Sequence, residues 1–539
     1  MRVLLMATIV AISWGCQTTP ADYGVIHDKA SDGDEVAIAQ LRDAFLNLPD
    51  LPARMDRLTD LEQQELQLVE DEPLKLGSIG TAILDTYYGS LTGHFVLERF
   101  YRHLESAEAE NHAQWVKRIR EHMQSGGDGG RTLPYPAITA AEAQIYLLSQ
   151  DMSPVGSMYQ TSEERPYTLL LQAREGPAQV TALHFDLEAV YQAMSQRFNN
   201  NAEFHPVALM YHLARQGDTA AQTAIGGYLA SQNELDTAVD WLRAASRTGN
   251  LLANSFLARI FWEKASKASD PDLKQEHLDA VLENYLHAIA LGSSDAMYAL
   301  GVLYLNGHYG EDNIPSGVPL LTQAADADHS DAAMFLAHMH YTGEAVDKDL
   351  DRAADYYVRA SELDNRFARR AYARFLLTEQ RHDPRAVDWL KELAKDDDGE
   401  AMVLLGNLHA RGIGVKQNLR RAVSWFKDAV AISPVDANIV NEVAWTLTVS
   451  DLEGLKRERY ALRIMDTLME GNADARSKPE YLDTWAAAYA ANGDFGRAIS
   501  LQEEAVEVAS EEQYAAVRDV LAEHLEAFQR GETITEKAP

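Results

Sequence analysis

The sequence of 539 residues contains a single cysteine, Cys16, so no disulfide bond can form within the chain. After its first residues it has no apolar run of the roughly 20 residues that a membrane-spanning helix needs. Basic residues are also scarce: 48 Lys and Arg stand against 82 Asp and Glu, a formal net charge of −34. Such a charge repels phosphate backbones, so we expect no nucleic-acid partner. It favours a strongly solvated surface over a specific basic partner.

Common catalytic motifs are missing as well. The sequence has no glycine-rich phosphate loop, no Gly-x-Ser-x-Gly elbow and no paired-cysteine metal site. His184 and Asp186 stand two apart, but such pairs are common by chance, and we interpret both as surface or turn residues. Two metal ligands on one helical face need a spacing of three or four. Spacings of nine and ten separate the four histidines His94, His103, His112 and His122. We therefore expect no metal, no cofactor and no catalytic residue.

Residues 1–15, MRVLLMATIVAISWG, have the composition of an export signal. A short basic start precedes an apolar core from Val3 to Ile12, and the small residue Gly15 precedes a cut at Cys16. This arrangement resembles a bacterial lipoprotein signal, in which the cysteine carries the lipid and becomes the first mature residue. Three and two residues before the cysteine, such a signal usually has Leu and a small residue, whereas this sequence has Ser13 and Trp14. An ordinary signal peptide with an incidental cysteine and an uncleaved anchor therefore stay open.

The lipoprotein resemblance implies a location. Gln17 follows the cysteine, where an Asp would resemble the signal for retention in the inner membrane. We therefore expect a lipid-anchored protein on the periplasmic face of the outer membrane. Its acyl chains would hold it firmly, since each buried methylene contributes about 0.8 kcal/mol. Residues 16–34 are polar and rich in Asp, Thr and Gly, which predicts a tether.

Residues 35–200 predict a smaller region of mixed structure. Apolar residues three and four apart predict helices over 36–48, over 55–69 and, in two pieces, over 79–123. Thr139 and Glu142 form a capping box that begins a short helix. Stretches at 168–173 and 180–185 predict two strands joined by a turn, and a helix follows them. We expect a helical and α+β module of unknown type.

Self-similarity between residues 205 and 510 is the strongest signal in the chain. Three segments begin with Ala and have Leu four residues later, a small residue five later and Gly eleven later. The starting alanines are Ala296, Ala332 and Ala401, the small residues are Gly301, Ala337 and Gly406, and the glycines are Gly307, Gly343 and Gly412. Degenerate copies begin at Ala221, Ala253 and Ala368, the second with a long insertion to about Val281.

Each unit predicts a pair of helices. The small residues allow the two helices to approach closely, and the glycine eleven residues after the alanine ends the first helix in a left-handed conformation. Each pair leaves an apolar face that the next pair must cover. His340 and His409 share one offset with the aromatic residues Phe261 and Tyr304. We therefore interpret both histidines as packing residues.

The pattern resembles the Sel-one-like repeat, a variant of the tetratricopeptide repeat with a longer loop. Residues 400–429 match it best, with a Leu-Gly pair, a Gly-x-Gly-Val loop at 412–415 and an Ala-x-x-Trp-Phe helix. Residues 436–510 resemble plain tetratricopeptide repeats, for example at Trp485 and Ala486. The resemblance implies a mostly α-helical protein, an α-solenoid of helix-turn-helix repeats over 205–435 and 436–510. A capping helix and a disordered tail are expected over 511–539.

The resemblance also implies an adaptor or assembly scaffold and not an enzyme. In such an array the first helix of each pair lines the concave face. Polar residues there, outside the packing offsets, are candidate partner contacts: His338, Thr342, Asn407 and Arg411. Partners would be other envelope proteins, by analogy with scaffolds of outer-membrane or exopolysaccharide-export complexes. The alternative is a hydrolase-like envelope enzyme with its site in residues 76–200 and the repeats as a targeting arm.

Overall fold

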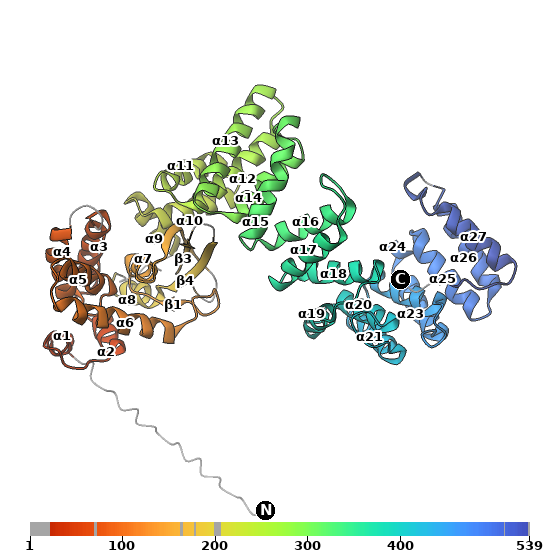
Figure 1. Cartoon of the computed structure of the whole chain (residues 1–539), viewed down its shortest axis with the longest axis horizontal. Coiled ribbons are helices and arrows are strands. Elements are labelled where there is room, and N and C mark those ends of the chain that lie inside the picture. Colours follow the sequence, from red (N-terminus) through yellow and green to blue (C-terminus); the bar gives the residue numbers. More distant parts are fainter. Residues whose placement is uncertain are drawn as a thin grey trace, which may run out of the picture. The chain divides into compact units, whose positions relative to one another are not determined.

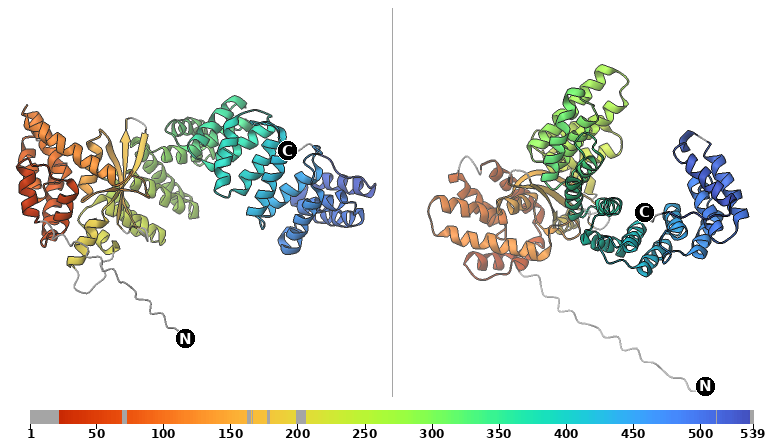
Figure 2. Two further views of the ribbon diagram at one scale, coloured as in Figure 1. Left: turned by 90° about the horizontal axis from the view of Figure 1, so that it is seen from below. Right: turned by 45° about the vertical axis from the view of Figure 1, so that its right-hand side comes forward.

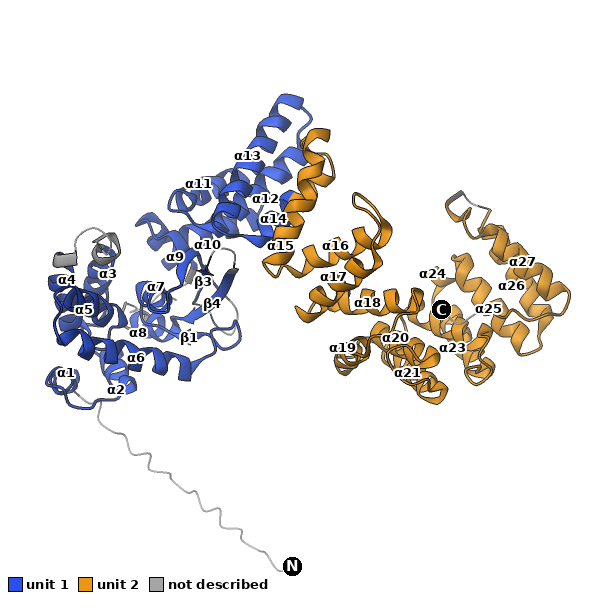
Figure 3. Ribbon diagram, viewed as in Figure 1, with its two compact units in different colours: residues 1–300 blue, residues 301–539 orange. Residues whose placement is uncertain are grey.

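The computed structural model describes residues 22–68, 73–161, 165, 167–176, 179–198, 206–510 and 512–536. The described residues are mostly helical with one four-stranded sheet, and the chain divides into two compact units, residues 1–300 and 301–539 (Figure 3). No helix within the described ranges has both the length and the apolar character needed to cross a membrane. The expected export signal and Cys16 precede residue 22 and lie outside the described residues.

Six helices form the first part of unit 1 (Figure 1): α1 (Tyr23–Ser31), α2 (Ile38–Leu46), α3 (Leu51–Leu68), α4 (Pro73–Thr86), α5 (Leu91–His103) and α6 (Glu108–Gly126). Helix α1 corrects the expected tether, because residues 23–31 are folded. Tyr23, Ile26 and Ala30 are buried on one face of this helix, and the Tyr23 hydroxyl donates to the Thr86 carbonyl at 3.5 Å. Three apolar residues at helical spacing suffice here because the helix packs on a core that already exists.

A four-stranded sheet follows, in the order β1-β4-β3-β2. Its elements are β1 (Tyr135–Pro136), α7 (Ala140–Leu148), β2 (Ser153–Gln160), β3 (Thr168–Glu175), β4 (Gln179–Asp186) and α8 (Glu188–Phe198). The predicted hairpin is confirmed by the antiparallel pair β3 and β4, while β1 joins β4 in parallel. The sequence analysis missed β2, because Ser153, Pro154 and Gly156 are weak strand formers and a bulge interrupts their pairing.

Strand β2 joins the sheet to the first repeats. It packs against α10 (Thr219–Ser231) and α12 (Leu251–Lys267), so the sheet of unit 1 lies between the front helices and repeat helices (Figure 2). Asn250 reaches across this contact and donates from Nδ2 to the Ser157 carbonyl at 2.9 Å. The mixed region and the first repeats both belong to the compact unit that ends at residue 300.

The repeats form successive helix pairs. In unit 1 the helices are α9 (Pro206–Arg215), α10, α11 (Leu235–Ser246), α12 and α13 (Pro271–Ala290), and α14 (Ser294–Leu305) spans the boundary. The long insertion expected after Ala253 does not form an extended loop, because it lengthens α12 and α13 to 17 and 20 residues.

Unit 2 continues the pairs to the last described residues. Its helices are α15 (Gly317–Asp326), α16 (Ser330–Thr342), α17 (Leu350–Glu362), α18 (Arg366–Thr378), α19 (Pro384–Lys395), α20 (Gly399–Arg411), α21 (Leu419–Ile432), α22 (Ala437–Val449), α23 (Glu458–Gly471), α24 (Ala473–Arg476), α25 (Pro479–Ala491), α26 (Phe495–Val508) and α27 (Arg518–Gln529). The short 3-10 helices η1 (Glu311–Ser316) and η2 (Glu512–Tyr514) connect some of them.

The predicted repeat register agrees with the packing. A Cβ atom added to Gly406 would lie 2.4 Å from Cε1 of Phe426, so only the smallest side chain fits this crossing. Gly343 and Gly412 end their helices at φ values of +81° and +76°, in the left-handed region. Ala345 replaces the second loop glycine of the best-matching unit and keeps a positive φ of +62°. The loop conformation therefore survives the substitution.

The expected disordered tail is ordered as far as it is described. Residues 531–536 follow α27, and Glu536 forms a parallel β-bridge with Ser450 at the end of α22. Ile534 is half-buried and packs against the apolar core of unit 2. The expectation of disorder was therefore wrong for residues 531–536, where main-chain and apolar contacts hold a polar stretch.

Candidate interaction surface

The four predicted contact residues lie on the first helices of two repeats but differ in exposure. His338 and Thr342 are exposed on α16, where the Thr342 hydroxyl donates to the His338 carbonyl at 3.0 Å. Arg411 is half-buried at the end of α20, and Asn407 is only 3% exposed. The two pairs belong to separate repeats, with α17, α18 and α19 between them in the chain.

Asn407 is buried because the next repeat covers it. Its side chain hydrogen-bonds to the Glu442 carboxyl group of α22, a helix that packs on α20. Burial raises the pKa of Glu442, the charge of Arg374 opposes that shift, and Glu400 adds to it. Asn407 is therefore a contact between repeats, although it occupies the same offset as the exposed His338. The position within a repeat does not by itself determine exposure, because a side chain at that position is buried only where a residue of the following repeat packs against it.

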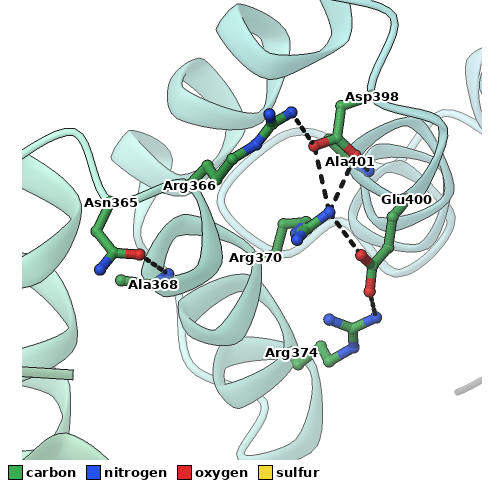
Figure 4. A network of polar contacts seen from close by, with 8 residues as sticks. All are labelled: Asn365, Arg366, Ala368, Arg370, Arg374, Asp398, Glu400 and Ala401. Atoms are coloured by element: carbon green, nitrogen blue, oxygen red, sulfur yellow. Dashed lines mark hydrogen bonds and ion pairs between the residues drawn. The ribbon is translucent and has the colours of Figure 1, made fainter. Parts of the chain in front are cut away.

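A row of three arginines on α18 is the most prominent polar feature of this region. Arg366, Arg370 and Arg374 follow one another at intervals of four residues and reach the start of α20 (Figure 4). We call them the α18 arginine row. The sequence analysis missed it, although the four-residue spacing that places side chains on one helical face was visible.

The acceptors of the row are two carboxylates of the next repeat. Asp398 Oδ2 lies 3.0 Å from Arg366 and 3.3 Å from Arg370, and Glu400 lies 2.6 Å from Arg370 and also pairs with Arg374 (Figure 4). Asp398 also caps α20, since its Oδ1 accepts from the Ala401 amide at 3.0 Å. Its side chain is 4% exposed, whereas those of Arg366 and Arg374 are about half exposed. The row is thus fixed at its acidic side and open to solvent at its ends.

An exposed aromatic residue stands beside this row. Phe367 is 61% exposed, and the guanidinium of Arg370 lies 5.1 Å from the centre of its ring. Aromatic residues and arginines are enriched where proteins bind each other, because they combine a large contact area with directed hydrogen bonds. Phe367 with the α18 arginine row forms a candidate interaction surface within unit 2.

A second polar cluster lies in unit 1 between α5 and α6. His94 Nε2 contacts the Tyr88 carbonyl at 2.8 Å, and the Nδ1 atoms of His94 and His112 are 3.0 Å apart. Because a carbonyl oxygen only accepts, Nε2 of neutral His94 carries its proton, and Nδ1 must accept from His112. Burial, followed by the charge of His112, lowers the pKa of His94 to about 3.

Histidine spacings along a single helix do not predict this pair. His94 and His112 lie on the neighbouring helices α5 and α6, which the short turn at 104–107 joins and which pack against each other. That turn was the local signal that the faces of the two helices could meet. The described residues hold no group of three or more His, Cys, Asp or Glu that could bind a metal ion.

His184 and Asp186 do not act together in the structure. Asp186 Oδ2 pairs with Arg165 at 2.8 Å, and its Oδ1 accepts from the Glu188 amide at the start of α8. His184 donates its backbone N–H to the Gly129 carbonyl at 2.9 Å, and burial lowers its pKa. Asp186 therefore has a local structural role at the end of β4.

Comparison with known proteins identifies the repeats. Residues 294–329, 330–365 and 399–430 match the family model of the Sel1 repeat. No curated protein matches the sequence significantly. These segments include the three copies that carry the complete alanine, leucine and glycine pattern.

Among solved structures, the chain is similar to a Sel1 repeat protein from Oxalobacter formigenes, with 16% identity, 60% of this chain and 91% of that chain covered, and a TM-score of 0.39. A protective antigen of uropathogenic Escherichia coli with an SLR fold is similar at 15% identity, with 92% and 97% covered and a TM-score of 0.41. Yeast Tom70 is similar at 12% identity, with 94% and 93% covered and a TM-score of 0.32. The chain therefore contains repeats of the Sel1 type over residues 294–365 and 399–430.

Proposed function

We propose that this protein is a scaffold that binds other proteins of the bacterial envelope through its repeats. In this proposal it is not an enzyme, and it helps to assemble an outer-membrane or exopolysaccharide-export complex. Repeat arrays of this kind offer extended surfaces on their helices and few enclosed sites, which suits protein partners. The family match supports protein–protein interaction, and the identity of the complex is our inference.

One observation carries the proposal: Phe367 is exposed beside the α18 arginine row. More than half of the surface of Phe367 is in contact with water. Burying an aromatic side chain in an interface contributes strongly to binding. On the same helix, Arg366 and Arg374 have half-exposed guanidinium groups that can donate to a partner's carboxylates. The surface therefore suits a partner that presents an apolar side chain near acidic residues.

The test places a photo-crosslinking amino acid at residue 367 of the full chain in the cells that produce it. We expect one defined crosslinked envelope protein. Val435, which is 84% exposed after α21, is the matched control position and should give no such product. The purified partner should then bind the full chain at least tenfold more weakly after Phe367→Ala with Arg374→Gln, with unchanged helical circular dichroism. Equal crosslinking at both positions, or unchanged affinity, would contradict the proposal.

We also propose that Cys16 carries the lipid anchor of this scaffold. The export-signal pattern before Cys16 supports this, and a lipid at the start of the mature chain would leave the repeats free to bind. The chain with Cys16→Ser should be found in the soluble periplasmic fraction or keep its signal uncut. A variant that is processed and still fractionates with the outer membrane would exclude lipidation at this residue.

A further inference from the structure

The chain beyond α27 folds back onto earlier repeats of unit 2. Gly531, at φ +73°, ends α27 with a Schellman motif, in which its amide donates to the Phe528 carbonyl and the Glu532 amide donates to the Ala527 carbonyl. The five residues that follow, 532–536, are called the strap below. They extend from the end of α27 to the end of α22.

The strap is held first by its backbone. The Glu536 amide donates to the Val449 carbonyl at 2.8 Å, and the Asp451 amide donates to the Glu536 carbonyl at 2.9 Å. These two bonds form a single parallel β-bridge with Ser450. Bonds between backbones do not depend on the side chains of the bound segment, so another extended peptide can make them in its place.

Two side chains of the strap add selectivity. The Trp445 indole donates to Glu536 Oε2 at 3.1 Å, and His524 Nε2 lies 4.0 Å from Glu536 Oε1. Two residues earlier, the half-buried Ile534 packs against the apolar core of unit 2. The strap site thus combines a carboxylate-binding pair, Trp445 and His524, with an apolar contact two residues away.

His524 is the basic group that faces the carboxylate of the strap. Its Nδ1 lies 2.9 Å from Asp483 Oδ1, and its ring centre is 5.8 Å from that of Trp445. Burial lowers the pKa of His524, but the hydrogen bond and the charge of Asp483, with that of Glu536, outweigh burial and raise it. A protonated His524 is positively charged beside the occupant's carboxylate.

We propose that the strap site binds an extended acidic segment of another protein, and that the strap occupies the site until such a segment displaces it. The partner segment has an aliphatic residue two positions before an acidic one, as Ile534 precedes Glu536. This inference rests on the proposed function of the chain as a binding scaffold. It assigns a second site, with different residues from the candidate surface at Phe367.

The contacts of the strap suit displacement. Glu532, Thr533, Thr535 and Glu536 are exposed, so the segment is held mainly by one β-bridge, one carboxylate and one apolar side chain. A tethered segment competes at an effective concentration on the order of mM, so a free peptide binds poorly while the strap is present. A partner that also contacts the chain elsewhere would overcome this competition.

The experiment measures fluorescence anisotropy of a labelled synthetic peptide with the sequence of residues 531–536. The full chain should bind it at least tenfold more weakly than a chain that ends at Gly531. In the shortened chain, Trp445→Phe should weaken binding about tenfold, as should Glu536→Gln in the peptide. Trp425→Phe is the matched control, because the Trp425 indole nitrogen is buried without a hydrogen-bond partner and lies outside the strap site.

Equal binding to the full and shortened chains would overturn the proposal, as would a folded shortened chain that does not bind the peptide. If the shortened chain does not fold, the full chain with Ile534→Ala and Glu536→Gln replaces it, and the same outcomes decide. Equal affinity for the Glu536→Gln peptide would exclude selection of an acidic occupant. The peptide assay uses only purified protein and peptide, whereas the scaffold proposal is tested by crosslinking at residue 367 in cells. Failure of one is therefore distinguishable from failure of the other.

Discussion

The sheet region of unit 1 and the repeats of unit 2 reach stability by contacts of different range. In the sheet region, the Asn250 side chain donates to the Ser157 carbonyl of β2 at 2.9 Å across 93 residues of sequence, and the Tyr159 hydroxyl donates to Asp218 Oδ2 at 3.3 Å across 59 residues. In the repeats, close packing joins neighbours such as Gly406 and Phe426. Contacts between neighbours leave a periodic pattern in the sequence, whereas distant polar contacts leave none.

The largest effect that would test this comparison is expected from Gly406→Leu. The added side chain would begin 2.4 Å from Phe426, which is fully buried, so α20 and α21 would have to separate. Overpacking of this kind costs about 3 kcal/mol or more of unfolding free energy. We expect a clear loss in the melting temperature of unit 2, with faster hydrogen exchange in α20 and α21.

Gly471→Leu provides the control for this substitution. Gly471 ends α23, and a Cβ atom added there would have no neighbour within 4 Å. This variant should melt close to the parent chain. Similar melting of both variants would show that the repeat register derived from the alanine and glycine offsets is incorrect.

The sequence predicts the repeats well because one rule recurs in each unit. Ala296, Ala332 and Ala401 are all buried, and the glycines eleven residues after them all have positive φ. Exposure at the remaining offsets was not predictable from one unit alone. Asn407 is buried because Glu442 packs against it, and Glu442 belongs to the following repeat. The sequence of the repeat that contains Asn407 therefore does not predict this burial.

The other errors have the same physical origin. Helix α1 and the strap both depend on contacts with residues far away in the sequence, and both look ordinary locally. The hairpin of β3 and β4 was predicted because its turn lies within a few residues of both strands. The arginine row was a local pattern and could have been predicted, but its acidic acceptors lie in the next repeat.

A second effect, confined to the front of unit 1, is expected from pH. Burial and the charge of His112 lower the pKa of His94 to about 3, so in the folded chain His94 stays neutral at mild acidity. The unfolded chain binds a proton below a pKa of about 6.5, so stability is complete above that pH and declines as the pH falls toward 3. The expected loss from this residue is about 2 kcal/mol at pH 5.

Hydrogen exchange in α5 and α6, followed from pH 7 to pH 5, measures this loss locally. The variant His94→Gln keeps a donor for the Tyr88 carbonyl but cannot titrate, so its exchange should depend less on pH than that of the parent chain. The same dependence in both would show that His94 does not couple acid to the stability of this region. The α20–α21 pair serves as an internal reference for general effects of acid.

The smallest expected effect concerns the contact between β2 of the sheet and α10 of the first repeats. Tyr159 of β2 donates from its hydroxyl to Asp218 Oδ2 at 3.3 Å, and Asp218 Oδ1 caps α10 by accepting from the Ala221 amide at 2.7 Å. Tyr159→Phe keeps the ring but removes the hydroxyl, which hydrogen-bonds to Asp218 and Tyr167, so we expect a loss of about 1 to 1.5 kcal/mol. Because β2 packs on α10, the loss should speed hydrogen exchange in both elements. If exchange rises in β2 while α10 stays protected, the sheet and the first repeats unfold independently. The long-range contacts then end at β2, and the first repeats depend only on their neighbours, like those of unit 2.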